Sequence, residues 1–170
     1  MSNTLRHAAL PVLALLACLA VGVHAQERYA GTWKIASSEP APWPHGADVE
    51  VPKEIAHLTG ATVAITSKGI DGPSPLACKG PHYKIRQDGP DMLFQGTLEE
   101  QGDKKSTPDK TATALGFTKR PIPTLETGCA SEIEFHAIDD DHLLFGLNNR
   151  VYRMVRVKPA AAKAAGSPAH

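Results

Sequence analysis

The sequence has no excess of charge of either sign. It contains 18 Lys and Arg against 18 Asp and Glu, so the formal net charge is zero with histidine neutral. Proteins that hold nucleic acid need a basic face that releases counterions from phosphates, and proteins that lie on anionic membranes need a polybasic segment. The even balance therefore argues against a nucleic-acid partner and against a membrane-surface partner.

Local catalytic motifs are also missing. The chain carries no G-x-S-x-G, H-E-x-x-H, P-loop or C-x-x-C pattern. A triad assembled in space would leave no such pattern, so an enzyme is not excluded. The missing motifs favour a protein that is not an enzyme, and we assign no catalytic residue, no cofactor and no metal site from the sequence.

Long apolar runs are scarce, and the single long run lies at the N-terminus. Arg6 precedes the run Ala8–Val23, and Val23-His24-Ala25 supplies small residues ahead of a cut. This layout is typical of a secretory signal peptide. The run counts about 16 residues, fewer than the roughly 20 that cross a bilayer as a helix. We therefore expect residues 1–25 to be removed, leaving an exported chain (periplasmic or secreted) with no transmembrane span.

A lipid anchor is the alternative for this segment. Leu15-Leu16-Ala17-Cys18 resembles the lipobox of bacterial lipoproteins, in which the cysteine is acylated and becomes the new N-terminus. The apolar run continues past Cys18, however, whereas a lipoprotein tether is usually polar. The mass of the mature N-terminus distinguishes the two outcomes.

Only three cysteines are present, and signal cleavage leaves Cys78 and Cys129. An even count in an exported chain predicts a disulfide, because oxidising compartments form and keep such bonds. The alternative is a metal site made by Cys78 and His82. A Cys-x3-His spacing without a second close pair is a weak zinc signature.

Most of the remaining chain alternates apolar and polar residues with the period of two that predicts β-strands. The predicted strands are Tyr29–Ala36, Thr62–Thr66, His82–Arg86, Met92–Leu98, Ser131–Ala137, His142–Leu147 and Val151–Val157, with Ala114–Thr118 left open as an eighth. Asp139-Asp140-Asp141 and Asn148-Asn149 lie where tight hairpins are expected, so the last three strands form an antiparallel meander. Pro52–Leu58 is the one predicted helix.

These elements predict a single all-β domain over residues 26–158, followed by a disordered tail over 159–170. Two long connections interrupt the β pattern, at Glu39–Val51 and Glu99–Thr113. The terminal meander favours an antiparallel small β-barrel, which also removes exposed strand edges. A β-sandwich is the alternative.

Gly31-Thr32-Trp33, on the first predicted strand, resembles the G-x-W signature of the lipocalin and wider calycin group. In that group the tryptophan packs at the closed end of the barrel beneath an arginine supplied from late in the chain. Arg150, Arg153 and Arg156 are available for that place, and we assign Arg153. The resemblance implies structural roles for Gly31, Trp33 and Arg153, and a small, mostly apolar ligand in the mouth of the barrel.

Candidate ligand-binding residues are aromatic. Trp43 lies in the stiff loop Ala41-Pro42-Trp43-Pro44-His45-Gly46, where it either covers a pocket or folds back over a barrel end. Tyr83, Phe94 and Phe145 lie on predicted strands and complete the set.

Acidic and histidine residues form a second candidate group. Glu132, Glu134 and His136 share one strand face, and facing inward they could bind a metal or act as acid and base. Their alternation with apolar residues favours a face open to solvent. Asp139-Asp140-Asp141 lacks the ligand spacing of a calcium loop and is expected to be a solvated turn.

Three hypotheses for function remain. The first is an exported β-barrel that binds a small apolar or amphipathic molecule. The second is a module that binds an envelope protein, as an enzyme inhibitor or immunity protein does, by inserting one of the two long connections. The third is a metal-dependent or acid–base enzyme that uses some of His82, His136, His142, Glu132 and Glu134. The oligomeric state is left open.

Overall fold

The computed structural model describes residues 27–43, 51–98 and 106–158. The predicted signal peptide, Cys18 and the predicted tail lie outside the described residues, as do residues 44–50 and 99–105 of the two long connections. Among the described residues, no helix has both the length and the apolar character needed to span a bilayer.

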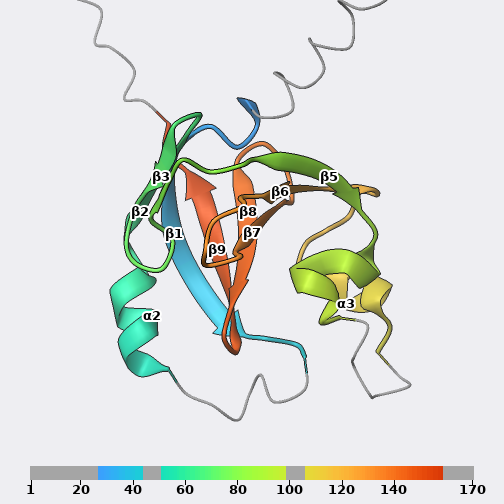
Figure 1. Cartoon of the computed structure of the whole chain (residues 1–170). Helices are drawn as coiled ribbons and strands as arrows, with labels where there is room; N and C mark the ends of the chain where they lie inside the picture. Colours follow the sequence, from blue (N-terminus) through green and yellow to red (C-terminus); the bar gives the residue numbers. More distant parts are fainter. Residues whose placement is uncertain (1–26, 44–50, 99–105, 159–170) are drawn as a thin grey trace, which may run out of the picture.

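The fold is one antiparallel sheet of nine strands, which confirms the all-β prediction (Figure 1). The strands are β1 (Gly31–Pro40), β2 (Thr62–Thr66), β3 (Gly69–Asp71), β4 (Cys78–Lys79), β5 (Lys84–Asp88), β6 (Ile122–Glu126), β7 (Glu134–Ala137), β8 (His142–Leu147) and β9 (Arg150–Arg156). They lie in the order β4-β3-β2-β1-β9-β8-β7-β6-β5. The predicted meander of the last three strands is confirmed by the ladders β7–β8 and β8–β9.

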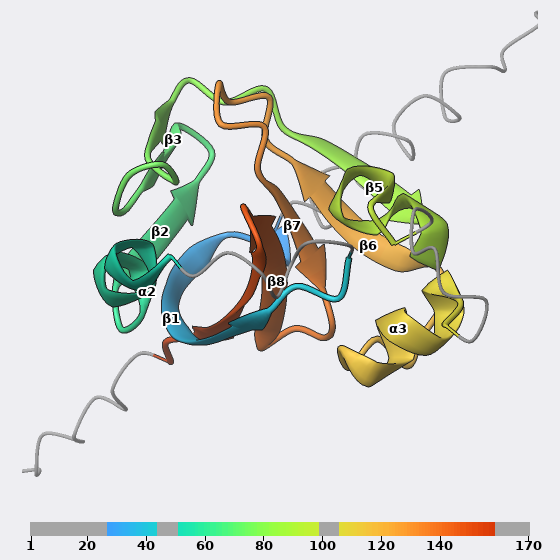
Figure 2. The same ribbon diagram turned by 90° about the horizontal axis from the view of Figure 1, so that it is seen from below.

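The sheet curls like part of a barrel wall but does not close (Figure 2). Strands β4 and β5 stand at its two edges and are not paired with each other. The structure is therefore an open half-barrel. Within the described ranges from residue 51 onward, three short helical segments accompany the sheet: α2 (Pro52–Leu58), the 3₁₀ segment η1 (Pro90–Gly96) and α3 (Pro108–Ala114).

Several predicted elements need correction. Met92–Leu98 is not a strand: it falls largely in η1, where Phe94 and Gln95 adopt left-handed backbone angles. Leu93, Phe94 and Leu98 of this segment pack onto the sheet from outside instead of forming a ladder. Strand β6 was missed because prolines at 121 and 123 mask it, and α3 was missed inside a polar connection. Ala114–Thr118 contains the end of α3 and the turn after it, not a strand.

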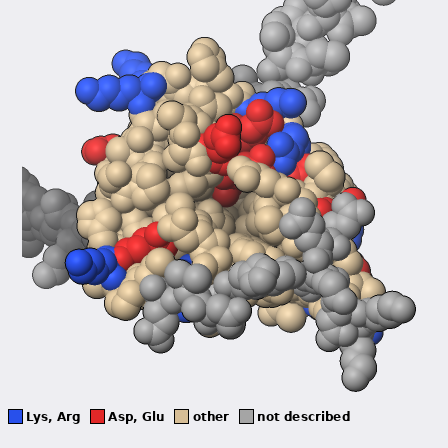
Figure 3. Space-filling view, turned by 60° about the horizontal axis from the view of Figure 1, so that its bottom comes forward, with Lys and Arg blue, Asp and Glu red and all other residues tan. Residues whose placement is uncertain are grey.

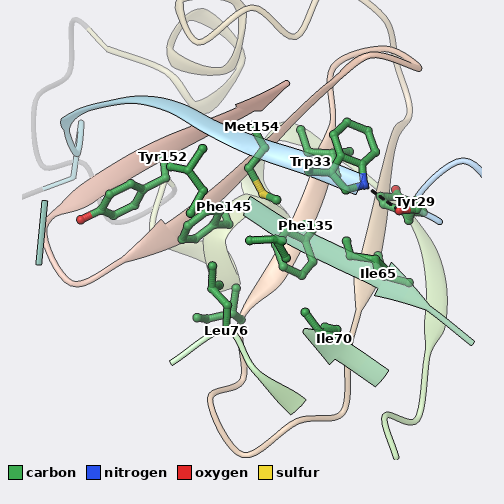
Figure 4. Packing of buried hydrophobic residues seen from close by; sticks show 14 of the residues in the cluster. Tyr29, Trp33, Ile65, Ile70, Leu76, Phe135, Phe145, Tyr152 and Met154 are labelled. Carbon is green, nitrogen blue, oxygen red and sulfur yellow. Dashed lines mark hydrogen bonds between the residues drawn. The ribbon is translucent and has the colours of Figure 1, made fainter. Parts of the chain in front are cut away.

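A large cluster of buried side chains fills the inside of the curl (Figure 4). Phe145 stacks on Tyr152 with ring centroids 5.0 Å apart, and Phe135 meets Phe145 edge-on at 5.8 Å. A second cluster, made largely of residues from η1, α3, β6, β8 and β9, covers part of the outer face. Because the sheet is packed on both faces there, its residues are held in fixed positions.

The arginine over Trp33 is Arg156, not Arg153. The Arg156 guanidinium carbon lies 4.1 Å from the centre of the Trp33 ring. The β1–β9 ladder explains the choice, because Trp33 is directly opposite Arg156 and shares its face of the sheet. Arg153 is on the other face, where it donates to the backbone oxygen of Leu115. A Cβ on Gly31 would lie 2.9 Å from Arg156, so glycine leaves room for the guanidinium.

The predicted disulfide between Cys78 and Cys129 is confirmed. It joins the edge strand β4 to the segment between β6 and β7, 51 residues further along the chain. A metal site using Cys78 and His82 is therefore ruled out, because the Cys78 sulfur is already bonded. The disulfide therefore ties the β4 edge of the curled sheet to a loop near its opposite end.

Candidate ligand-binding pocket

A pocket of about 220 Å³ opens beside η1 and the ends of β7 and β8. Its lining comes from separate parts of the chain: Trp43, Phe94, Gln95, Thr97, Ser131, Glu132, Ile133, Glu134, His136, Gly146, Leu147 and Asn148. Figure 3 shows this face of the molecule hollowed near its centre, with acidic side chains gathered beside the hollow. Trp43 and Phe94 of the lining belong to the cluster on the outer face, whereas Ile133 and Leu147 also pack with the inner cluster, so the pocket opens on the outer side of the sheet.

The apolar wall of the pocket is the pair Trp43 and Phe94, whose ring centroids lie 5.4 Å apart. Both rings press against Gly146 of β8. A Cβ at that position would lie 3.1 Å from Phe94 Cδ1 and 3.2 Å from Trp43 Cη2. Glycine in the middle of a strand costs stability, and here its bare backbone gives the two rings their place.

Strained backbone is concentrated at this pocket. Among the described residues, four non-glycine residues have positive φ: Phe94 (51°), Gln95 (61°), Glu132 (54°) and Asn148 (50°). All four line the pocket. Left-handed backbone costs roughly 1–2 kcal/mol for residues with a Cβ, although asparagine tolerates it better. Such strain persists where the surrounding structure imposes it, and it gathers at functional sites.

His136 anchors the strained segment to the sheet. The backbone N–H of Phe94 donates to Nε2 of His136 at 3.1 Å, and Nδ1 lies 2.9 Å from Thr124 Oγ1. Since Nε2 accepts, the proton resides on Nδ1 and is donated to Thr124. Burial lowers the pKa of His136 to about 3, so the ring is neutral at physiological pH. The predicted exposure of this face is wrong for His136, because η1 covers it.

Beside His136, Arg86 is surrounded by carboxylates. It makes two hydrogen bonds to Asp88, at 3.2 and 3.0 Å, and pairs with Glu134 at 2.8 Å and with Glu126 at 3.1 Å. The hydrogen bonds that Arg86 donates to Asp88 and to Glu134 raise the pKa of Arg86 further above its ordinary value. The side chains of Asp88 and Glu134 are only 6% and 9% exposed, so Arg86 supplies their counter-charge.

Asp88, Glu134 and His136 also bring potential metal-ligand atoms within 4.8 Å of one another. The chemistry of the group does not fit a metal ion, however. Arg86 already bridges the two carboxylates, and both ring nitrogens of His136 are engaged in hydrogen bonds. The arrangement is that of a hydrogen-bonded ion-pair network that supports the pocket floor.

The structure separates the predicted site residues into two groups. Trp43 and Phe94 meet at the pocket, whereas Phe145 lies wholly within the inner cluster and Tyr83 packs against that cluster. Glu132, Glu134 and His136 also line the pocket. The other two histidines do not: His82 is exposed, and His142 pairs with Asp139 at 2.8 Å.

Sequence reasoning missed Gln95, Gly146 and Asn148 as lining residues. The Asn148-Asn149 pair predicts a hairpin turn, which the structure confirms between β8 and β9, but it carries no signal for a pocket. Comparisons of the chain with protein-family models, with curated proteins and with solved structures find no match. The pocket geometry is therefore the basis for a functional proposal.

Proposed function

We propose that this protein is an exported binding protein that holds a small amphipathic molecule in the pocket beside Trp43. The predicted signal peptide and the disulfide support export, because such bonds persist in oxidising compartments. The pocket offers an aromatic wall on one side and polar side chains on the other, which is the usual composition of a small-molecule site.

The observation that carries the proposal is that the residues with strained, left-handed backbone angles line the same pocket. Four residues from three separate segments, Phe94 and Gln95, Glu132, and Asn148, hold left-handed backbone around one pocket. The tight turn between β8 and β9 accounts for the positive φ of Asn148, but no two-residue hairpin requires it at Phe94, Gln95 or Glu132. A rigid, pre-formed binding site explains why these residues line one cavity, because pre-organisation reduces the free-energy cost of binding.

The size of the pocket limits the ligand. Drug-sized molecules occupy pockets of roughly 300–1,000 Å³, whereas this one encloses about 220 Å³. The pocket therefore suits a molecule with a single ring or a short chain, or the end group of a longer one. A lipid with two full acyl chains does not fit inside it.

A thermal-shift screen of small amphipathic compounds tests the proposal. We expect at least one class to raise the melting temperature of the native chain, and Trp43→Ala to fold but lose that response. Met92→Ala is the matched control, since Met92 is 51% exposed and does not line the pocket. A response that survives Trp43→Ala unchanged would contradict a site at this pocket.

A further inference from the structure

The charges around the pocket point to the class of ligand. We infer that the ligand is a small organic cation, with an amine or guanidinium group attached to an apolar group. This inference rests on the proposed function. The charged end lies at Glu132 and the apolar end lies against Trp43 and Phe94.

Three titratable side chains line the pocket among the described residues: Glu132, Glu134 and His136. His136 is neutral, since Nε2 accepts from the backbone and Nδ1 donates to Thr124. No lysine or arginine appears among the described lining residues. The charge presented to a ligand is therefore negative.

Arg86 does not cancel this charge. Its guanidinium is shared by Asp88, Glu126 and Glu134, so three carboxylates meet one arginine. Lys84 adds a distant contact to Glu126, at 3.8 Å, from a side chain that is 67% exposed. The network therefore keeps a surplus of negative charge beside the pocket.

Glu132 is the carboxylate available to a ligand. It is exposed, it lines the pocket, and it has no ion-pair partner among the described residues. A second hollow shares Glu132 and Glu134 with the pocket and is also lined by Glu126 and by Arg86, the cation that these carboxylates outnumber. The hydrogen bond from Gln95 Nε2 to the Glu132 carbonyl, at 2.7 Å, ties the Glu132 backbone to η1. This bond fixes the acidic end of the pocket relative to the aromatic end.

The aromatic wall favours the same ligand. The rings of Trp43 and Phe94 offer an apolar surface to its apolar group, while the charged group lies at Glu132. An anion in the pocket would be repelled by the carboxylates. A neutral ligand with a hydroxyl group donates a hydrogen bond to Glu132 but does not neutralise its charge, so it gains less there than a cation does.

Three probes of similar shape distinguish the effect of ligand charge from the effect of ligand shape. They are 2-phenylethylamine, which is a cation at pH 7, neutral 2-phenylethanol, and anionic phenylacetate. Binding is measured by isothermal titration calorimetry to the native chain. We expect the amine to bind about tenfold more tightly than the alcohol, with the anion weakest, and the advantage to shrink as salt is added.

Glu132→Gln provides the residue-level test, with Glu39→Gln as the control, because Glu39 is an exposed residue of β1 that does not line the pocket. We expect Glu132→Gln to weaken amine binding about fivefold and to leave alcohol binding unchanged. Unfolding curves of both variants establish that they are folded.

The outcomes distinguish the two proposals. If the alcohol or the anion binds as tightly as the amine, the cation inference is wrong and the binding pocket stands. Equal losses of amine and alcohol binding in Glu132→Gln would overturn the inference in the same way. If none of the three probes binds at millimolar concentration, both the inference and the proposed pocket fail.

Discussion

The backbone N–H of Phe94 donates a 3.1 Å hydrogen bond to Nε2 of His136, and this bond connects the left-handed part of η1 to strand β7. The same imidazole meets the Phe94 ring edge-on, with centroids 4.7 Å apart. A neutral histidine is needed, because a protonated Nε2 cannot accept from the backbone. The protonation state of one buried ring thus controls the geometry of the pocket wall.

His136 predicts a specific loss of stability in acid. Burial lowers its pKa to about 3 in the folded chain, whereas an unfolded histidine has a pKa of about 6.5. Between these values the unfolded state binds a proton that the folded state does not. The free energy of unfolding is therefore highest above pH 6.5, and falls as the pH drops towards 3, by up to about 1.4 kcal/mol per pH unit.

Urea unfolding of the native chain and of His136→Gln, measured between about pH 7 and 4, checks this expectation. His136→Gln is expected to lose the part of the slope that comes from His136, and His57→Gln, at an exposed position in α2, is expected to keep it. If the free energy of unfolding of the native chain and of His136→Gln changes with pH in the same way, the His136 ring is not held neutral by burial. NMR titration of the His136 ring gives the same pKa directly if the variant does not fold.

Arg86 is expected to be essential for stability. Arg86→Met removes the counter-charge from Asp88 and Glu134, whose side chains are almost fully buried. Breaking a buried ion pair by removing one partner costs about 3–5 kcal/mol. Chemical denaturation measures the loss, and adding Asp88→Asn and Glu134→Gln to Arg86→Met is expected to restore part of it.

Lys84→Met is the matched control for that experiment, because Lys84 lies on the same strand and contacts Glu126 from an exposed position. Its loss is expected to change the free energy of unfolding by less than about 1 kcal/mol. Similar effects of the two substitutions would show that the Arg86 network is an ordinary surface cluster.

The strands and the pocket differ in how far the sequence predicts them. Thr62–Thr66, His142–Leu147 and Pro52–Leu58 were predicted at the residues where the structure has β2, β8 and α2. The alternation of apolar and polar residues and a proline at the start of a helix are local signals, so a short stretch of sequence is enough to predict these elements. The alternation of β7 also identified the face that carries Glu134 and His136.

The same alternation could not say what covers that face. His136 is buried because η1 folds over it, and η1 itself shows a strand-like pattern that was misinterpreted. The left-handed backbone of Phe94 and Gln95 has no sequence signal, since neither residue type favours positive φ. Sites built from tertiary contacts between several segments are therefore the part that single-sequence patterns miss.

Backbone strain at Glu132 predicts that glycine stabilises this position more than alanine does, which is the reverse of the usual order. Glycine adopts positive φ without a steric cost, so Glu132→Gly is expected to be about 1 kcal/mol more stable than Glu132→Ala. At Glu39, in strand β1, the order is expected to reverse, with alanine the more stable by about 0.5–1 kcal/mol. Denaturant midpoints of the four variants give both comparisons. Alanine more stable than glycine at both positions would show that Glu132 carries no strain.

The most direct test of the pocket as a binding site uses the two tryptophans of the chain, because Trp33 is fully buried in the inner cluster and Trp43 lines the pocket. In a ¹⁵N–¹H NMR spectrum each indole N–H gives its own signal, and Trp43→Phe assigns them. On titration with 2-phenylethylamine, we predict a saturable shift of the Trp43 signal and an unchanged Trp33 signal. A shift of Trp33 with Trp43 unchanged, or no shift of either signal, would contradict ligand binding in this pocket.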